Sequence, residues 1–175
     1  MALTTTQQAT LKAALLADSE LAAFPPNADG SFALAALLNT AASPDYWVWR
    51  SKITQSEIVS TTSGDATTFS WTTYIGRSAG ERDAWRQMFA NSGDAVNPSN
   101  ANVRAAFADI FSGVSGAGQR AHLVAVGRRK ATRGEKIFAS ATPGGSGESG
   151  STGNPASMGF EGALAWQDVD DARNS

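Results

Sequence analysis

The segment that decides the fold class is residues 78–113, which read SAGERDAWRQMFANSGDAVNPSNANVRAAFADIFSG. Ser78 and Glu81 fit a capping box, in which the two side chains satisfy unpaired backbone N–H groups at the start of a helix. A helix is therefore predicted over 79–90. Its inward face is expected to carry Trp85, Met88 and Phe89.

A second helix is predicted over 101–112, after a loop at 91–100 that contains glycine, proline and several asparagines. Glycines between 113 and 118 end this helix. Its apolar face is expected to carry Val103, Phe107, Ile110 and Phe111. Two amphipathic helices joined by a loop indicate a chain that is mainly α-helical.

Toward the N-terminus, helices are predicted over 5–23 and 31–42, separated by a break at 24–30 that contains two prolines and a glycine. Between 46 and 76 the residues alternate with a period of two, around a turn cluster at 62–65, which predicts a long β-hairpin. The core residues expected in the two helices are Leu11, Leu15, Leu16 and Leu21, and Phe32, Leu34, Leu37 and Leu38.

Toward the C-terminus, the longest helix is predicted over 119–139, and it holds six of the 14 lysines and arginines of the chain. A basic helix of this kind fits DNA phosphates or an acidic protein surface. The residues expected to make that contact are Arg128, Arg129, Lys130, Arg133 and Lys136. The alternative is an ordinary solvated face that complements the negative end of the helix dipole.

The last segment, 140–175, is predicted to be a Gly/Ser-rich tether followed by an extended docking tail, attached to a helical domain at 1–139. The predicted fold class is mainly α: a small helical bundle with a long β-hairpin excursion at 46–76 and an extended C-terminal tail. The residues expected to dock on other subunits are Trp47, Trp49, Trp71, Phe160, Leu164 and Trp166. The three hairpin tryptophans are also consistent with packing of the hairpin onto the helices.

The composition excludes several kinds of chemistry. The chain has no cysteine and one histidine, His122, so disulfides, cysteine ligands and histidine pairs cannot form within it. His122 is expected to be solvated or at an interface. Glycines at 145–150 match the spacing GxGxxG, but they follow a predicted helix instead of a strand, so no nucleotide site is inferred. We expect no enzymatic activity, no cofactor and no metal site.

The surface is expected to be weakly charged, because charged residues make up only 17% of the chain and the net charge is −2. Such a surface is easily desolvated against neighbouring subunits, although a compositional bias of the genome explains it equally well. No signal peptide and no apolar run of membrane-spanning length is visible. We therefore expect synthesis in a cytoplasm and no membrane partner.

The order of segments resembles a known group of proteins. The runs that carry the resemblance are WVWRSKITQSEI, ERDAWRQMF, NVRAAFADIFSG, RRKATRGEKIFA and PASMGFEGALAWQDV. Together they are similar to small structural proteins of tailed bacteriophages, most of all to the head-to-tail connector (adaptor, or neck) proteins. The substantial hairpin at 46–76 departs from the simplest, all-helical adaptors, which leaves another neck or tail component as an alternative.

The resemblance implies a location in the neck of the virion and assembly into a ring, usually of twelve copies, below the portal. It implies the portal protein and a downstream neck or tail protein as partners. The hairpin and the tail would contact other subunits, and the basic helix would face the DNA channel or an acidic portal surface. Deleting 156–175 would then leave a folded subunit that no longer assembles. The alternative function is a nucleic-acid-binding packaging or regulatory factor that uses the basic helix.

Overall fold

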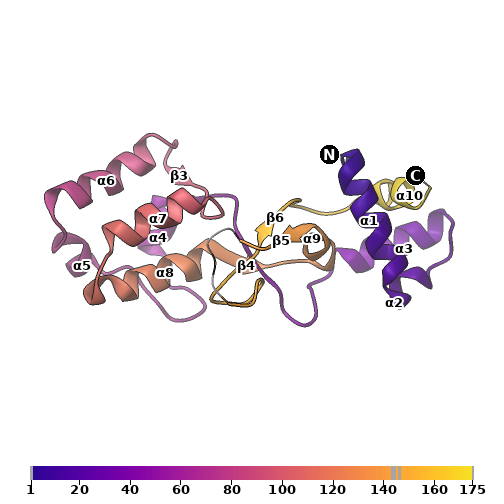
Figure 1. The fold of residues 1–175 in the computed structure, drawn as a ribbon, viewed down its shortest axis with the longest axis horizontal. Helices are drawn as coiled ribbons and strands as arrows, with labels where there is room; N and C mark the ends of the chain where they lie inside the picture. Colours follow the sequence, from indigo (N-terminus) through magenta and orange to yellow (C-terminus); the bar gives the residue numbers. More distant parts are fainter. Residues whose placement is uncertain (1, 143–144, 146, 175) are drawn as a thin grey trace. The chain divides into compact units, whose positions relative to one another are not determined.

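The computed structural model describes residues 2–142, 145 and 147–174, and these residues fold mainly as α-helices (Figure 1). The predicted mainly α class is therefore confirmed. The described strands are two or three residues long and form three two-stranded pairs. Within the described part of the chain, no helix combines the length and the apolar character needed to cross a membrane.

The chain divides into two compact units. Unit 1 takes its described residues from Met1–Tyr46, Lys130–Ser140 and Ser157–Ser175, and unit 2 takes its own from Trp47–Arg129 and Ala141–Ala156. These units do not follow the expected division into a domain and a tail, because both of them use residues beyond 139.

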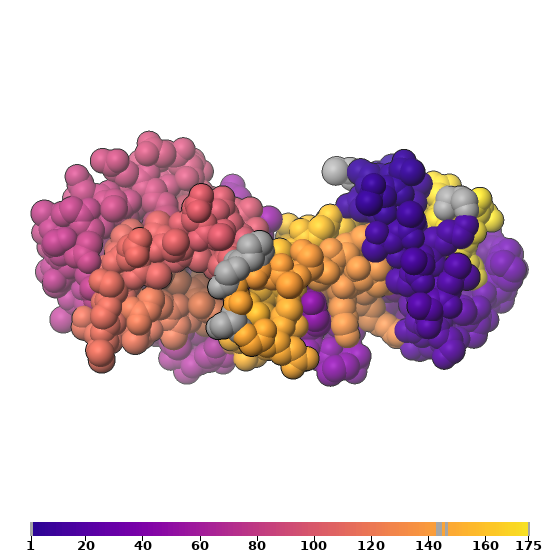
Figure 2. All heavy atoms as spheres, in the orientation of Figure 1, coloured from indigo at the N-terminus to yellow at the C-terminus, as the bar shows by residue number. Residues whose placement is uncertain are grey.

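Unit 1 is a small helical cluster completed by the C-terminus of the chain. Its elements are α1 (Thr5–Ala17), α2 (Ser19–Ala22), α3 (Ala28–Leu38), α9 (Arg133–Phe138), β5 (Ala139–Ser140), β6 (Ser157–Met158) and α10 (Trp166–Asn174). Figure 1 shows α1, α3 and α10 grouped together, and in the space-filling view the indigo α1 lies against the yellow C-terminal segment (Figure 2). The core residues include Leu11, Leu15, Leu34, Leu38, Phe138, Leu164, Val169 and Ala172.

Local capping explains where the helices of unit 1 begin. The single helix predicted over 5–23 is divided at Asp18, whose carboxylate accepts from the backbone N–H of Glu20 at 2.9 Å and so caps α2. The helix predicted over 31–42 begins earlier, because the Asn27 side chain accepts from the N–H of Gly30 at 2.8 Å. The buried face of α3 carries Leu34, Ala35 and Leu38, and Phe32 lies off this face with 65% of its surface exposed.

The predicted extended tail is wrong. Residues 166–174 form α10, which packs on α1 and α3, and Leu164 is only 3% exposed. Leu164 lies against the backbone of Gly134, where a Cβ would come within 2.8 Å of its Cδ1. The apolar alternation in the tail therefore reflects burial inside unit 1.

Unit 2 is built on helices that carry aromatic rings. Its elements are β1 (Trp47–Trp49), β2 (Ile53–Thr54), α4 (Gln55–Ser60), α5 (Trp71–Ile75), α6 (Ala79–Ala90), β3 (Ala95–Val96), α7 (Ala101–Ile110), the 3₁₀ turn η1 (Val114–Gly116) and α8 (Ala117–Gly127), and it contains the start of β4 (Arg128–Lys130). The predicted helices 79–90 and 101–112 are confirmed as α6 and α7, the second ending two residues early.

Trp85 is the centre of the unit 2 core. It is 1% exposed, and its ring centroid lies 5.0 Å from Phe89 and 5.5 Å from both Phe107 and Phe111. Phe69 is a further neighbour, at 5.6 Å. Buried aromatic pairs at these separations add about 0.5–1.5 kcal/mol each beyond the burial of their surface.

The predicted β-hairpin at 46–76 is wrong. Strand β1 pairs with β4, and β2 pairs with β3 in the register Ile53 with Val96, so neither strand pairs within the segment. Thr54 and Glu57 form a capping box that starts α4, and Ser70 caps α5. Helical capping therefore overrides the alternating pattern in this segment.

The predicted basic helix over 119–139 is also wrong, because the chain leaves the helix at Gly127. Gly127 packs closely there: a Cβ at this position would lie 3.2 Å from Pro98 and 3.3 Å from the Trp49 ring. The chain continues as β4, and a capping box formed by Thr132 and Glu135 starts the short helix α9.

The described part of the predicted tether folds back on β1; residues 143, 144 and 146 lie outside the described residues. The backbone N–H of Trp47 donates to the carbonyl of Gly150 at 2.7 Å, and that of Trp49 donates to the carbonyl of Ala156 at 2.9 Å. The Trp49 indole N–H donates to the hydroxyl of Thr142 at 3.1 Å. These bonds attach the segment to the body of unit 2.

We predict that Leu164→Ala lowers the free energy of unfolding of unit 1 by about 2–5 kcal/mol, because it leaves a cavity beside Gly134. Urea denaturation followed by circular dichroism measures this. Leu16→Ala is the matched control, since Leu16 is 72% exposed, and it should change little.

Deleting 156–175 should remove the unfolding transition of unit 1, and a truncated chain that keeps it would contradict the packing described.

Candidate functional site

The basic residues singled out in the sequence do not form one helical stripe. Arg128, Arg129 and Lys130 make up β4, whereas Arg133 and Lys136 lie on α9. The side chains of four of them make contacts within their own units: Arg128, Lys130, Arg133 and Lys136.

Carboxylates pair with three of these cations. The Arg128 guanidinium binds Asp65 and lies 4.7 Å from the centroid of the Trp47 ring. Lys130 binds Asp45 at 2.7 Å, and Arg133 binds Glu20 at 2.6 Å. A phosphate that approached these side chains would have to compete with carboxylates already bound.

The pair of Glu20 and Arg133 persists into acid. The hydrogen bond from Arg133, aided by its charge, holds the pKa of Glu20 below its ordinary value. Glu20 therefore stays ionised to a lower pH than an isolated glutamate does. Lys136 makes a different contact, with its ammonium 5.4 Å from the centroid of the Tyr46 ring.

The six predicted docking residues differ in exposure. Trp49 and Leu164 are buried, at 4% and 3%, so the structure corrects their expected place on the surface: both belong to cores. Trp47 and Phe160 are half-buried, Trp47 beneath Arg128 and Phe160 beside the Phe138 ring at 5.2 Å. Trp71 and Trp166 are exposed, at 53% and 37%.

Sequence reasoning missed four exposed apolar side chains: Leu16, Phe32, Ile75 and Val114. Leu16 and Phe32 had been assigned to helix cores. Nothing local in the sequence separates Phe32 from the buried Leu34 and Leu38, because the buried face of α3 is set by its packing in unit 1.

Three exposed apolar side chains of unit 2 lie on α5 and on η1: Trp71, Ile75 and Val114. Trp71 and Ile75 are one helical turn apart on α5. Arg77, just after α5, donates to the carbonyl of Ser112 at 2.9 Å and to the hydroxyl of Ser115 at 3.1 Å, which holds η1 beside α5. We call this the α5–η1 surface, and it is an exposed apolar patch of the kind that marks protein contacts.

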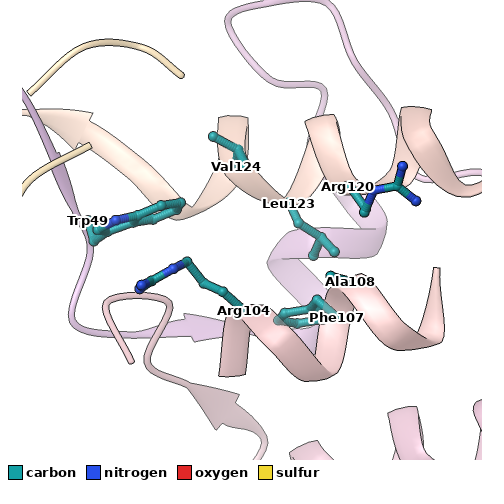
Figure 3. Close-up of a pocket in the computed structure, with 7 residues that line it drawn as sticks. All are labelled: Trp49, Arg104, Phe107, Ala108, Arg120, Leu123 and Val124. Carbon is teal, nitrogen blue, oxygen red and sulfur yellow. The ribbon is translucent and has the colours of Figure 1, made fainter. Parts of the chain in front are cut away.

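A separate apolar pocket of about 190 Å³ opens between β1, α7 and α8 of unit 2 (Figure 3). It is lined by Trp49, Arg104, Phe107, Ala108, Arg120, Leu123 and Val124. Figure 3 shows the indole of Trp49 and the side chain of Arg104 at one end of the pocket and Arg120 at the other. We call this the arginine-flanked pocket.

Backbone carbonyls fix both arginines of this pocket. Arg104 donates to the carbonyls of Pro98 and Ser99 at 2.9 and 2.7 Å, and its guanidinium lies 5.3 Å from the centroid of the Trp49 ring. Burial lowers the pKa of Arg104 from its ordinary value. Arg120 donates to the carbonyls of Phe111 and Gly113. The pocket is therefore lined by apolar side chains, with one arginine at each end.

His122 is buried, in contrast to its predicted place at the surface or an interface. Its Nε2 lies 2.8 Å from the carbonyl oxygen of Ile58 and its Nδ1 lies 2.9 Å from the hydroxyl of Thr67, so the ring links α8 to α4 and to the loop after α4. Among the residues that the structure describes, no cluster of three metal-ligating side chains is present.

Comparison with known proteins gives no match: no protein-family model, no curated protein and no solved structure is significantly similar to this chain.

We predict weak binding of the chain to duplex DNA, because carboxylates pair with Arg128, Lys130 and Arg133. Removing these carboxylates with Glu20→Gln, Asp45→Asn and Asp65→Asn should raise the salt concentration needed to elute the protein from immobilised DNA. The matched control, Asp29→Asn, Asp94→Asn and Asp109→Asn, changes the net charge equally and should elute earlier than the first variant. Strong retention of the unaltered chain, lost with Arg129→Ala and Arg133→Ala, would contradict this and favour a nucleic-acid-binding role.

Proposed function

We propose that this chain is a structural virion protein, a head-to-tail connector adaptor that forms an oligomeric ring, docks on the portal and continues the DNA channel. In this proposal the protein acts in the virion neck after synthesis in the host cytoplasm. Its partners are further copies of itself, the portal protein and a downstream neck or tail protein. It carries out no catalysis and uses no cofactor.

The observation that supports the proposal best is the exposure of large apolar side chains on both units. Leu16, Phe32 and Trp166 are exposed on unit 1, and Trp71, Ile75 and Val114 are exposed on unit 2. Burying one such side chain is worth about 1.5–3 kcal/mol, so these surfaces gain stability from a protein partner. A subunit inside a ring touches two neighbours, and contact surfaces on both units suit that requirement.

The low charge of the chain supports the same function. Charged residues are depleted at the centres of protein interfaces, and they make up 17% of this chain. A nucleic-acid-binding packaging or regulatory factor is supported less well, because carboxylates pair with Arg128, Lys130 and Arg133. Non-specific contact with DNA in the channel is still compatible with the adaptor role. The alternative within the virion is that the chain is another component of the neck or tail.

Native mass spectrometry and negative-stain imaging of the purified chain, alone and with portal protein, test the proposal. We expect closed rings, with twelve copies as the favoured number. Ile75→Asp should prevent assembly, because it places a charge in the α5–η1 surface where the side chain is 63% exposed and the fold does not need it.

The matched control is Thr72→Asp, an exposed position on the same helix, which should interfere less. A chain that stays monomeric at every concentration and does not bind the portal would overturn the proposed function.

A further inference from the structure

The single histidine of the chain, His122, is buried in unit 2 with 0% of its surface exposed. It lies on α8, and its ring contacts α4 through the carbonyl of Ile58 and residues 61–70 through the hydroxyl of Thr67. We call residues 61–70 the α4–α5 loop. Imidazole gains a proton close to neutral pH, so a buried histidine that joins three segments of a fold can make their contact depend on pH.

The hydrogen-bond partners of the ring fix the position of its hydrogen. The carbonyl oxygen of Ile58 can only accept, so the Nε2 atom, 2.8 Å away, carries a hydrogen. A neutral imidazole has one N–H group, and its Nδ1 atom is therefore an acceptor. The hydroxyl of Thr67, 2.9 Å from Nδ1, donates to it.

Ser63 completes this chain of hydrogen bonds. Its hydroxyl oxygen accepts from the backbone N–H groups of Asp65 at 3.3 Å and Thr67 at 3.2 Å, which occupies both of its lone pairs. Its own hydrogen is left to donate to the Thr67 hydroxyl oxygen, 2.6 Å away. Ser63 therefore donates to Thr67 and Thr67 donates to His122, and the neutral ring satisfies every group in the chain.

The ring has no acidic partner among the described residues. The charged residues of α4, the α4–α5 loop and α8 are bonded elsewhere: Glu57 to Arg50, Asp65 to Arg128, and Arg120 to backbone carbonyls. A second proton on the ring would bury a positive charge with no carboxylate bound to it. That proton would also lie on Nδ1, the atom that accepts from Thr67, and the two donors would face each other.

We propose that His122 is a pH-sensitive switch: the neutral ring holds the α4–α5 loop on α8, and the protonated ring releases it. The proton that breaks the contact binds Nδ1, and the hydroxyl of Thr67 loses its acceptor. The switch belongs to unit 2 alone, and it goes beyond the proposed function without depending on it.

The α4–α5 loop connects this switch to the aromatic core. Phe69, two residues after Thr67, is 9% exposed, and its ring centroid lies 5.6 Å from that of Trp85 and 5.1 Å from that of Trp71. Release of Thr67 removes a constraint on the position of Phe69. Acid therefore loosens the ring that packs between the unit 2 core and Trp71 of the α5–η1 surface.

The position of the ring hydrogen can be measured directly. Because the chain has one histidine, long-range proton–nitrogen NMR correlation spectra of the full chain report on His122 alone. At about pH 7.5 we expect a neutral ring with its hydrogen on Nε2. A hydrogen on Nδ1, or a charged ring at this pH, would overturn the proposed switch.

Hydrogen exchange of the full chain, followed at single amides by NMR, measures release of the loop. The informative amides are those of Ser63, bonded to the carbonyl of Thr67 at 3.0 Å, and Ala66, bonded to the carbonyl of Ser63 at 2.9 Å. A released imidazole takes up one proton below about pH 6.5, so we expect their protection factors to fall about tenfold between about pH 7.5 and about pH 5.5. The amides at the centre of α6 serve as the internal control and should keep their protection.

Two substitutions identify the group responsible. His122→Gln cannot gain a proton, and its amide can still donate to the carbonyl of Ile58, so the loop amides should be equally protected at both pH values. Thr67→Val removes the hydroxyl that the ring accepts from, and it should lower loop protection about two- to tenfold already at about pH 7.5. Thr68→Val, at the exposed neighbouring position, is the matched control and should leave loop protection unchanged.

Three results would overturn the switch: loop protection that does not change with pH, loop protection that falls only in step with α6, or a full acid-induced fall that persists in His122→Gln. If His122→Gln does not fold, the exchange of the unaltered chain and of Thr67→Val decides. Ring assembly near neutral pH tests the proposed function separately, because the switch is closed under those conditions.

Discussion

Packing of the C-terminal segment between α1 and α3 is the interaction on which unit 1 depends. Val169 and Ala172 are fully buried there, and the Asp168 carboxylate accepts from the backbone N–H groups of Ala165 at 2.9 Å and Leu3 at 3.3 Å. One buried carboxylate thus caps α10 and joins it to the N-terminal segment. Since Leu164, Val169 and Ala172 lie in the core of unit 1, the tail is part of the folded unit and not an extended arm.

The parts of the fold that follow from local rules were predictable. Ser78 and Glu81 start α6, and the inward positions of Trp85 and Phe89 follow from helical spacing. The alternation around Trp47 indicates an extended strand with one buried side, but it does not identify the strand that pairs with it. The hairpin prediction failed because that partner, β4, lies about eighty residues away along the chain. The helix start at Thr54 was visible in the sequence as a capping box, but the alternation concealed it.

The candidate site was predictable only in part. Trp166 is exposed, as a docking residue should be, whereas Leu164, two residues earlier, is buried in the core of unit 1. The apolar character of the two side chains does not distinguish the exposed position from the buried one. The arginine-flanked pocket was not predictable, because Trp49, Arg104 and Arg120 come from three separate elements. The basic stripe failed because α8 ends at Gly127, so the cations from Arg128 onward are divided between β4 and α9.

The central claim is that the C-terminal segment belongs to the folded subunit before any partner binds. Hydrogen exchange of the isolated monomeric chain, followed by peptide mass spectrometry, measures this most directly. We predict that the backbone amides of α10 are protected to the same degree as those of α1 and α3, because the three helices share one core. Exchange of residues 166–174 at the rate of an unfolded peptide, with α1 and α3 still protected, would contradict it.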